Sequence, residues 1–124
     1  MSITVMVVDD SSVMRKIVIR TLRASGLNMG TVLEGSSGEE ALKLITEGNR
    51  PQLIVSDINM GGMDGITFVR HARSVLPPAL TRIVMITTEG GADKINAAMS
   101  AGANAYLTKP FTPEQVANSL GPLV

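Results

Sequence analysis

Short apolar segments rich in Val and Ile alternate along the chain with longer segments in which apolar residues recur at helical spacing. Each short segment is bounded by polar or glycine-containing stretches, which is typical of strands buried on both faces. We expect five strands, at residues 3–8, 31–33, 53–57, 83–86 and 105–108. Strict alternation of strands with helices favours a single doubly wound α/β domain built on a parallel sheet.

Helix start and stop signals lie between these strands. We expect N-caps at Ser12, Ser37, Asp64 and Thr112, and helix ends at Gly26, Gly48 and Gly102. Glu40 and Gln115 each follow an expected cap by three residues, which is the spacing of a capping box. Pro77 and Pro78 require the third helix to end before them.

The composition narrows the class of protein. With 11 basic and 11 acidic residues among 124, the net charge is zero, so neither nucleic acid nor an anionic membrane is an expected partner. The absence of Cys excludes disulfides, thiolate metal sites and a catalytic thiol. No signal peptide or bilayer-spanning apolar segment is visible. We therefore expect one soluble, cytoplasmic domain over residues 1–124.

Polar residues suited to phosphoryl chemistry follow four of the five expected strands. These residues are Asp9, Asp10, Asp57, Thr87 and Lys109. The carboxyl ends of parallel strands share one edge of a sheet, where ligands bind. Carboxylates gathered there repel one another by on the order of a few kcal/mol per pair, and Mg²⁺ would relieve that repulsion while binding phosphate oxygens. The pattern predicts phosphoryl transfer to a carboxylate nucleophile, Asp57, assisted by Thr87 and Lys109.

A purely structural role for these residues is the competing interpretation. An ion-pair network could tie the strand ends together without any chemistry. Because a cluster with more acids than bases is a poor source of stability, we favour the phosphoryl-transfer hypothesis. We expect Gly61 and Gly62 to form a turn, the sole His71 to be solvated, and the Met residues to serve mainly in packing.

The motifs resemble those of response-regulator receiver domains, and most closely the single-domain chemotaxis regulators. They are Val7-Val8-Asp9-Asp10-Ser11-Ser12, Asp57 with Met63-Asp64-Gly65, Thr87, and Lys109-Pro110-Phe111. The resemblance spans essentially the whole chain. It implies a flavodoxin-like fold in which five helices surround a five-stranded parallel sheet of order 2-1-3-4-5.

The resemblance also implies roles in phosphorylation and metal binding. Asp57 matches the phosphoacceptor, which receives its phosphoryl group from a histidine kinase. Asp10 and Asp57 match side-chain ligands of Mg²⁺, Asn59 matches the position that ligates through its backbone carbonyl, and Asp9 matches the acid that acts through metal-bound water. Thr87 and Lys109 match the residues that hold the phosphoryl oxygens.

Further positions match residues that switch or tune such a site. By the resemblance, Tyr106 changes rotamer on activation, the Lys109-Pro110 peptide bond is cis, and Asn59 and Glu89 tune dephosphorylation. Thr88 stands where the family usually has Ala or Gly. We hypothesise that its bulk narrows the approach of the attacking water and lengthens the lifetime of the phosphate.

The function implied is that of a phosphorylation-switched signalling protein, not an enzyme acting on a separate substrate. The expected partners of this monomer are a histidine kinase, a phosphatase and a phosphorylation-dependent target, the flagellar motor switch. The target would bind around Ile95, Met99, Tyr106 and Thr112. One alternative is a stand-alone receiver in a phosphorelay or phosphate sink. Another is a Mg²⁺-dependent aspartyl phosphatase of the haloacid-dehalogenase type, but such enzymes need an acid two residues after the nucleophile, where this chain has Asn59.

Overall fold

A single parallel sheet organises the molecule. The computed structural model describes residues 2–88 and 92–123, and within them five strands pair in the order β2-β1-β3-β4-β5. The strands are β1 (Ile3–Val8), β2 (Met29–Gly35), β3 (Leu53–Asp57), β4 (Arg82–Thr87) and β5 (Ala105–Thr108). The helices are α1 (Ser12–Ala24), α2 (Gly38–Thr46), α3 (Gly65–Arg73), α4 (Ala92–Ala101) and α5 (Pro113–Leu120), followed by a 3₁₀ turn at Gly121–Leu123. The predicted fold class and strand order are confirmed.

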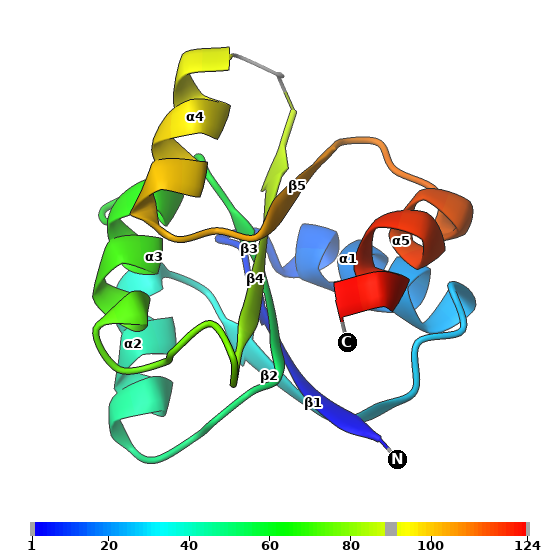
Figure 1. Ribbon diagram of the computed structural model, residues 1–124, viewed down its shortest axis with the longest axis horizontal. Helices are drawn as coiled ribbons and strands as arrows, with labels where there is room; N and C mark the ends of the chain where they lie inside the picture. Colours follow the sequence, from blue (N-terminus) through cyan, green and yellow to red (C-terminus); the bar gives the residue numbers. More distant parts are fainter. Residues whose placement is uncertain (1, 89–91, 124) are drawn as a thin grey trace.

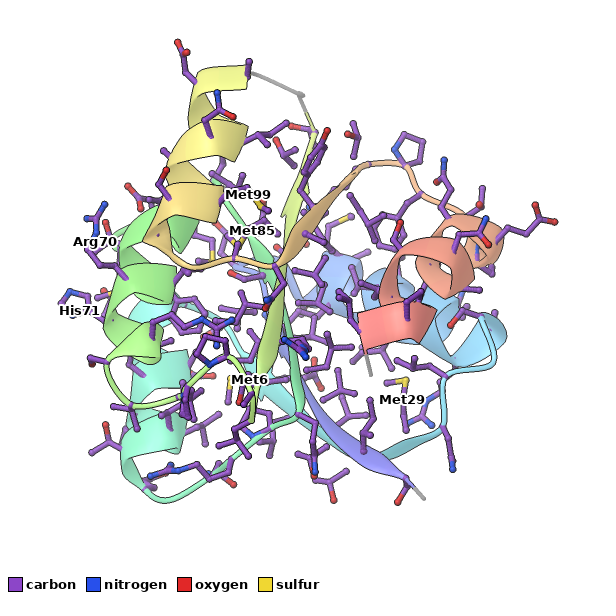
Figure 2. The ribbon with its side chains drawn as sticks, in the orientation of Figure 1. Met6, Met29, Arg70, His71, Met85 and Met99 are labelled. Atoms are coloured by element: carbon purple, nitrogen blue, oxygen red, sulfur yellow. The ribbon has the colours of Figure 1, made fainter. Side chains whose placement is uncertain are left out.

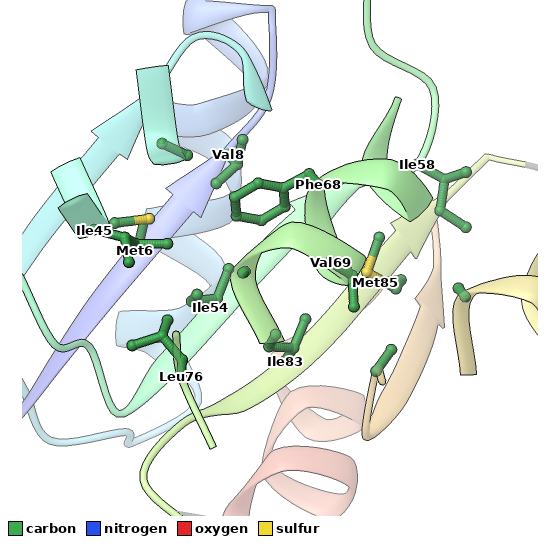
Figure 3. Packing of buried hydrophobic residues seen from close by; sticks show 14 of the residues in the cluster. Met6, Val8, Ile45, Ile54, Ile58, Phe68, Val69, Leu76, Ile83 and Met85 are labelled. Carbon is green, nitrogen blue, oxygen red and sulfur yellow. The ribbon is translucent and has the colours of Figure 1, made fainter. Parts of the chain in front are cut away.

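The helices cover both faces of the sheet, so the core has two halves. Figure 1 shows α1 and α5 on one face and α2, α3 and α4 on the other. Successive residues of a strand point to opposite faces. Val5 and Val7 of β1 therefore pack in the half beneath α1 and α5, whereas Met6 packs in the half beneath α2 and α3. Figure 3 shows this second half, with the fully buried Phe68 of α3 among its side chains.

Most helix signals act as the sequence predicts. Asp64 caps α3 by accepting from the Thr67 N–H at 2.7 Å. At α5, Thr112 and Gln115 form a complete capping box. Gly26, Gly48 and Gly102 follow their helices with φ of +90°, +108° and +124°, a region that favours glycine.

Three local predictions were wrong. Ser11, not Ser12, caps α1: its backbone is extended as the chain leaves β1, and its hydroxyl accepts from the Met14 N–H at 3.2 Å. The Glu40 carboxylate accepts from the Ser36 N–H and hydroxyl, so only the Ser37 half of that capping box forms. β2 is longer than residues 31–33 because it pairs along the whole of β1.

The outer face of α3 is polar. Figure 2 shows His71 and Arg70 directed away from the sheet, and both residues are exposed, so the prediction of a solvated His71 is confirmed. Met6 and Met85 are fully buried, as expected for packing residues, but Met99 on α4 is 39% exposed. Among the described residues, no helix combines the length and apolar character needed to cross a bilayer.

Arg73 fastens three segments together at the end of α3. Its guanidinium donates to the carbonyl oxygens of Leu76 at 3.1 Å, Thr81 at 2.7 Å and Gly102 at 2.9 Å. It also donates to Asn104 Oδ1 at 2.7 Å. These bonds join the end of α3 to the start of β4 and to the turn between α4 and β5.

Candidate functional site

Three carboxylates converge at the carboxyl ends of β1 and β3. Val8 and Ser56 are paired across the two strands, so the residues that follow them, Asp9 and Asp57, emerge side by side. One carboxylate oxygen from each of Asp9, Asp10 and Asp57 lies within 4.8 Å of the others. The sheet thus assembles the acidic cluster that the sequence predicts.

Lys109, the residue that follows the edge strand β5, adds a positive charge to this cluster. Its ammonium lies 3.2 Å from Asp9 Oδ2 and 3.2 Å from Asp57 Oδ2. The Lys109 N–H donates to the Thr87 carbonyl at 2.7 Å, which ties the residue to the end of β4. The Lys109-Pro110 peptide bond is cis, as predicted.

The cluster carries unbalanced charge in a poorly hydrated place. Asp9 is only 3% exposed, and the side chains of Asp57 and Lys109 are 12% and 10% exposed. Burial raises the pKa of the Asp57 carboxyl above its ordinary value; Lys109 opposes this rise, and the charge of Asp9 adds to it. One cation shared between two of three acids leaves the site short of positive charge.

The donor set fits a hard divalent cation. Three carboxylates supply the oxygen ligands that Mg²⁺ prefers. Backbone donors orient all three. The Ser11 N–H donates to Asp9 Oδ1 at 2.9 Å, the Gly61 N–H to Asp10 Oδ2 at 3.3 Å, and the Asn59 N–H to Asp57 Oδ1 at 3.3 Å. Asp10 is exposed, so the group opens to solvent on its side.

The loop between β3 and α3 depends on a glycine. The Gly65 N–H donates to the Ile58 carbonyl at 2.8 Å, which folds the start of α3 back onto the end of β3. A Cβ at Gly65 would collide with the Asp57 carbonyl oxygen and lie 2.8 Å from the Ile58 Cα. The Met63-Asp64-Gly65 motif therefore combines a helix cap with a close backbone approach that holds the Asp57 segment in place.

The remaining predicted residues lie around the cluster. Thr87 ends β4 and is 1% exposed, whereas Thr88, the next residue, is exposed. Tyr106 on β5 is opposite Met85 of β4 in the register and is 45% exposed, so its ring is directed outward. Glu89 lies outside the described residues.

Two site residues were missed by the sequence analysis. Arg15 of α1 donates to the Asp9 carbonyl at 2.6 Å and to Glu34 Oε1 at 3.0 Å. Lys94 of α4 donates to Asn59 Oδ1 at 2.8 Å, and the Asn59 N–H donates to Asp57 Oδ1 at 3.3 Å. Their positions early in helices that follow strands were the available signal, because such helix starts lie at the ligand-binding edge.

An apolar cleft adjoins the cluster. Its volume is about 370 Å³, and its lining consists of Met14, Ile17, Val18, Thr21, Thr88, Lys109, Pro110 and Phe111. Ile17 on its rim is 45% exposed and the nearby Val13 of α1 is 64% exposed. α1 itself carries four basic residues and no acidic one.

Comparison with known proteins agrees with this geometry. Residues 5–120 match the response regulator receiver domain family. A CheY homologue of Campylobacter jejuni, a chemotaxis protein, is 39% identical over 115 residues, which cover 93% of this chain and 87% of that protein. The chemotaxis protein CheY1 of Helicobacter pylori is 40% identical over 115 residues, covering 93% and 91%. The solved structure of the Vibrio cholerae chemotaxis protein CheY4 superposes with a TM-score of 0.85 at 34% identity and covers 100% of both chains. The chain belongs to the response-regulator receiver domain family.

Proposed function

We propose that Asp57 accepts a phosphoryl group from a phosphohistidine of a histidine kinase. An Asp57 oxygen attacks phosphorus, the phosphorus–nitrogen bond breaks, and its electron pair leaves with the imidazole, which takes up a proton. The observation that carries this proposal is the convergence of three carboxylates on Asp57 with Lys109 at 3.2 Å from two of them. Such an excess of acid is suited to a site completed by a metal and a phosphoryl group.

The other residues take roles in holding the phosphoryl group. Lys109 moves its charge from the Asp57 carboxylate to a phosphoryl oxygen, and the Thr87 hydroxyl donates to another. Side chains of Asp10 and Asp57, the backbone carbonyl of Asn59, and Asp9 through water would hold Mg²⁺. When bound, this ion neutralises charge on the transferring group.

The phosphorylated site would act on a binding surface formed by α4, β5 and α5. Tyr106, exposed beside a polar hollow of about 340 Å³ formed by β5 and α5, turns inward when Thr87 moves toward the phosphoryl group. A target protein would then bind the face that includes Ile95, Met99 and Thr112. Unchanged Tyr106 and Thr87 rotamers in a beryllofluoride complex would contradict this switch.

The relatives are chemotaxis proteins, which favours a role in chemotaxis. We propose that this chain acts there through control of flagellar rotation. In this proposal residues 1–124 act as one monomeric cytoplasmic receiver whose partners are a chemotaxis kinase, the flagellar motor switch and a phosphatase. The apolar cleft beside Lys109, with basic α1 at its rim, is suited to the donor protein. Binding of a motor-switch peptide would distinguish this role from that of a phosphorelay receiver or phosphate sink, which would not bind it.

The phosphatase alternative receives no support. The position two residues after Asp57 is Asn59, whose side-chain oxygen accepts from Lys94 and which has no acidic group to offer. The protein is therefore proposed as a phosphoacceptor and not as an enzyme that turns over a separate substrate.

Intact mass after incubation with acetyl phosphate and Mg²⁺ tests the proposal. We expect one labile phosphoryl adduct on the parent protein and none on Asp57→Asn. Asp93→Asn, an exposed Asp change on α4, is the matched control and should be modified like the parent. Absence of an adduct and of beryllofluoride binding in the folded parent would refute the proposal.

A further inference from the structure

Lys94 brings a second ammonium group to Asn59, in the loop that follows Asp57. It comes from the first turns of α4, 35 residues from Asn59 in sequence, and donates to Asn59 Oδ1 at 2.8 Å. The Asn59 N–H in turn donates to Asp57 Oδ1 at 3.3 Å, whereas Lys109 contacts Asp57 Oδ2 at 3.2 Å. Lys109 therefore contacts one Asp57 oxygen directly, whereas Lys94 contacts the residue whose N–H binds the other oxygen.

The residue that Lys94 contacts, Asn59, is neutral and does not balance the positive charge of Lys94. Over residues 2–88 and 92–123, the ion pairs are those of Arg15 with Glu34 and of Lys109 with Asp9 and Asp57, and Lys94 takes part in none of them. An ammonium only donates hydrogen bonds, so a neutral amide oxygen can fix its position without neutralising it. Lys94 is thus positioned at the site while its charge remains available to an anion.

Phosphorylation creates a need for that charge. An acyl phosphate replaces the single charge of Asp57 by about two negative charges. Together with Asp9 and Asp10, the phosphorylated site would carry more negative charge than a divalent cation and Lys109 can balance. One further cation completes the balance, and Lys94 is joined through Asn59 to the Asp57 oxygen that Lys109 does not contact.

We propose that Lys94 is a second phosphoryl-directing cation, which attracts small anionic phosphodonors and stabilises the phosphorylated form. This inference rests on the proposed function of Asp57. With acetyl phosphate, an Asp57 oxygen forms the new bond to phosphorus, the phosphorus–oxygen bond to acetate breaks, and acetate leaves with its electron pair. Lys94 takes no part in bond making; it acts by charge, and Asn59 positions it.

Lys94→Gln tests the proposal because it keeps a hydrogen-bond donor but removes the charge. Lys94→Arg restores the charge, and Lys43→Gln on α2 removes an exposed lysine away from the site. We expect Lys94→Gln to weaken beryllofluoride binding and to slow phosphorylation by acetyl phosphate, each about threefold at low salt, since the group is exposed to solvent. The difference should shrink at high salt, and Lys94→Arg and Lys43→Gln should behave like the parent.

The outcomes separate this inference from the function on which it rests. If the parent takes up neither beryllofluoride nor a phosphoryl group, the proposed function fails and this inference fails with it. If the parent is modified normally and Lys94→Gln matches it at low salt, only the role of Lys94 is refuted. Equal losses in Lys94→Gln and Lys94→Arg would also overturn it, because the effect would then come from the shape of the contact and not from charge.

Discussion

Asp57→Asn should stabilise the fold in the absence of Mg²⁺, although it removes the functional group. Burial raises the pKa of Asp57, which means that the folded state tolerates the ionised carboxylate less well than the unfolded chain does. The Asn side chain has nearly the same shape and no charge. Lys109 still has Asp9 at 3.2 Å after the substitution, so no buried cation is left alone.

The magnitude follows from opposing electrostatic contributions. Two carboxylates whose oxygens lie within 4.8 Å of one another repel by ~3.5 kcal/mol or more at an effective dielectric constant of about 20. The substitution relieves that repulsion, which largely offsets the loss of the Lys109 attraction across 3.2 Å, ~5 kcal/mol on the same scale. The Asp57 side chain is only 12% exposed, so removing this carboxylate from water also costs the parent free energy, and Asp57→Asn avoids most of that cost. We therefore expect the substitution to raise the free energy of unfolding by about 1 kcal/mol.

The stability difference between Asp57→Asn and the parent should depend on pH and on Mg²⁺. A folded-state pKa above the unfolded value costs stability as pH rises through it, so the advantage of Asp57→Asn should be present near neutral pH and lost as pH falls to about 4. Mg²⁺ at ten times its Kd should stabilise the parent by about 1.4 kcal/mol, and the variant by less.

Urea unfolding followed by far-UV circular dichroism is the suitable assay, because the chain has no Trp and one Tyr. Asp93→Asn serves as the control, with an expected change of no more than about 0.5 kcal/mol. A Mg²⁺-free Asp57→Asn protein that unfolds at lower urea than the parent at neutral pH would show that Lys109 outweighs burial and would refute the reasoning.

Three further predictions concern the surroundings of the site. Gly65→Ala should shift the Asp57 segment, because its Cβ would lie 2.8 Å from the Ile58 Cα. We expect the free energy of unfolding, measured in urea, to fall by about 2 kcal/mol and phosphorylation to become slower. Unchanged values of both would contradict the close approach. Arg73→Ala should lower the free energy of unfolding by about 3 kcal/mol, because four acceptors lose a charged donor. A loss below about 1 kcal/mol would mean that water replaces the guanidinium as the donor. Thr88→Ala should shorten the lifetime of the phosphorylated form, followed by intact mass, whereas an equal lifetime would end the hypothesis that its bulk hinders water.

Local patterns were enough to predict the fold class and the gathering of Asp9, Asp57 and Lys109 at one end of the strands. Buried strands need continuous apolar residues whatever their surroundings, and capping residues such as Asp64 act within one turn of helix. Parallel strands bring their carboxyl ends to one edge, so Asp9, Asp57 and Lys109 could be placed together from their positions after apolar segments alone. The receiver resemblance then supplied the strand order and the cis peptide bond between Lys109 and Pro110, neither of which periodicity predicts.

Tertiary structure decided what depends on relative placement. Of two adjacent serines, the one left extended by the turn out of β1 became the cap. The Glu40 carboxylate accepts two hydrogen bonds from Ser36, from its N–H and its hydroxyl, and does not complete the capping box with Ser37. The hydrogen bond from Lys94 to Asn59 arises only when the first turn of α4 lies beside the loop that follows β3. The early position of Lys94 in α4 indicated the right edge of the sheet, but not this partner 35 residues away in sequence. Sequence alone therefore determined which residues gather at the edge of the sheet, because hydrophobic periodicity and the parallel arrangement of strands act at every position. The distances, the burial that raises the pKa of Asp57 and the arrival of Lys94 were set by packing, because each depends on the three-dimensional positions of several segments at once.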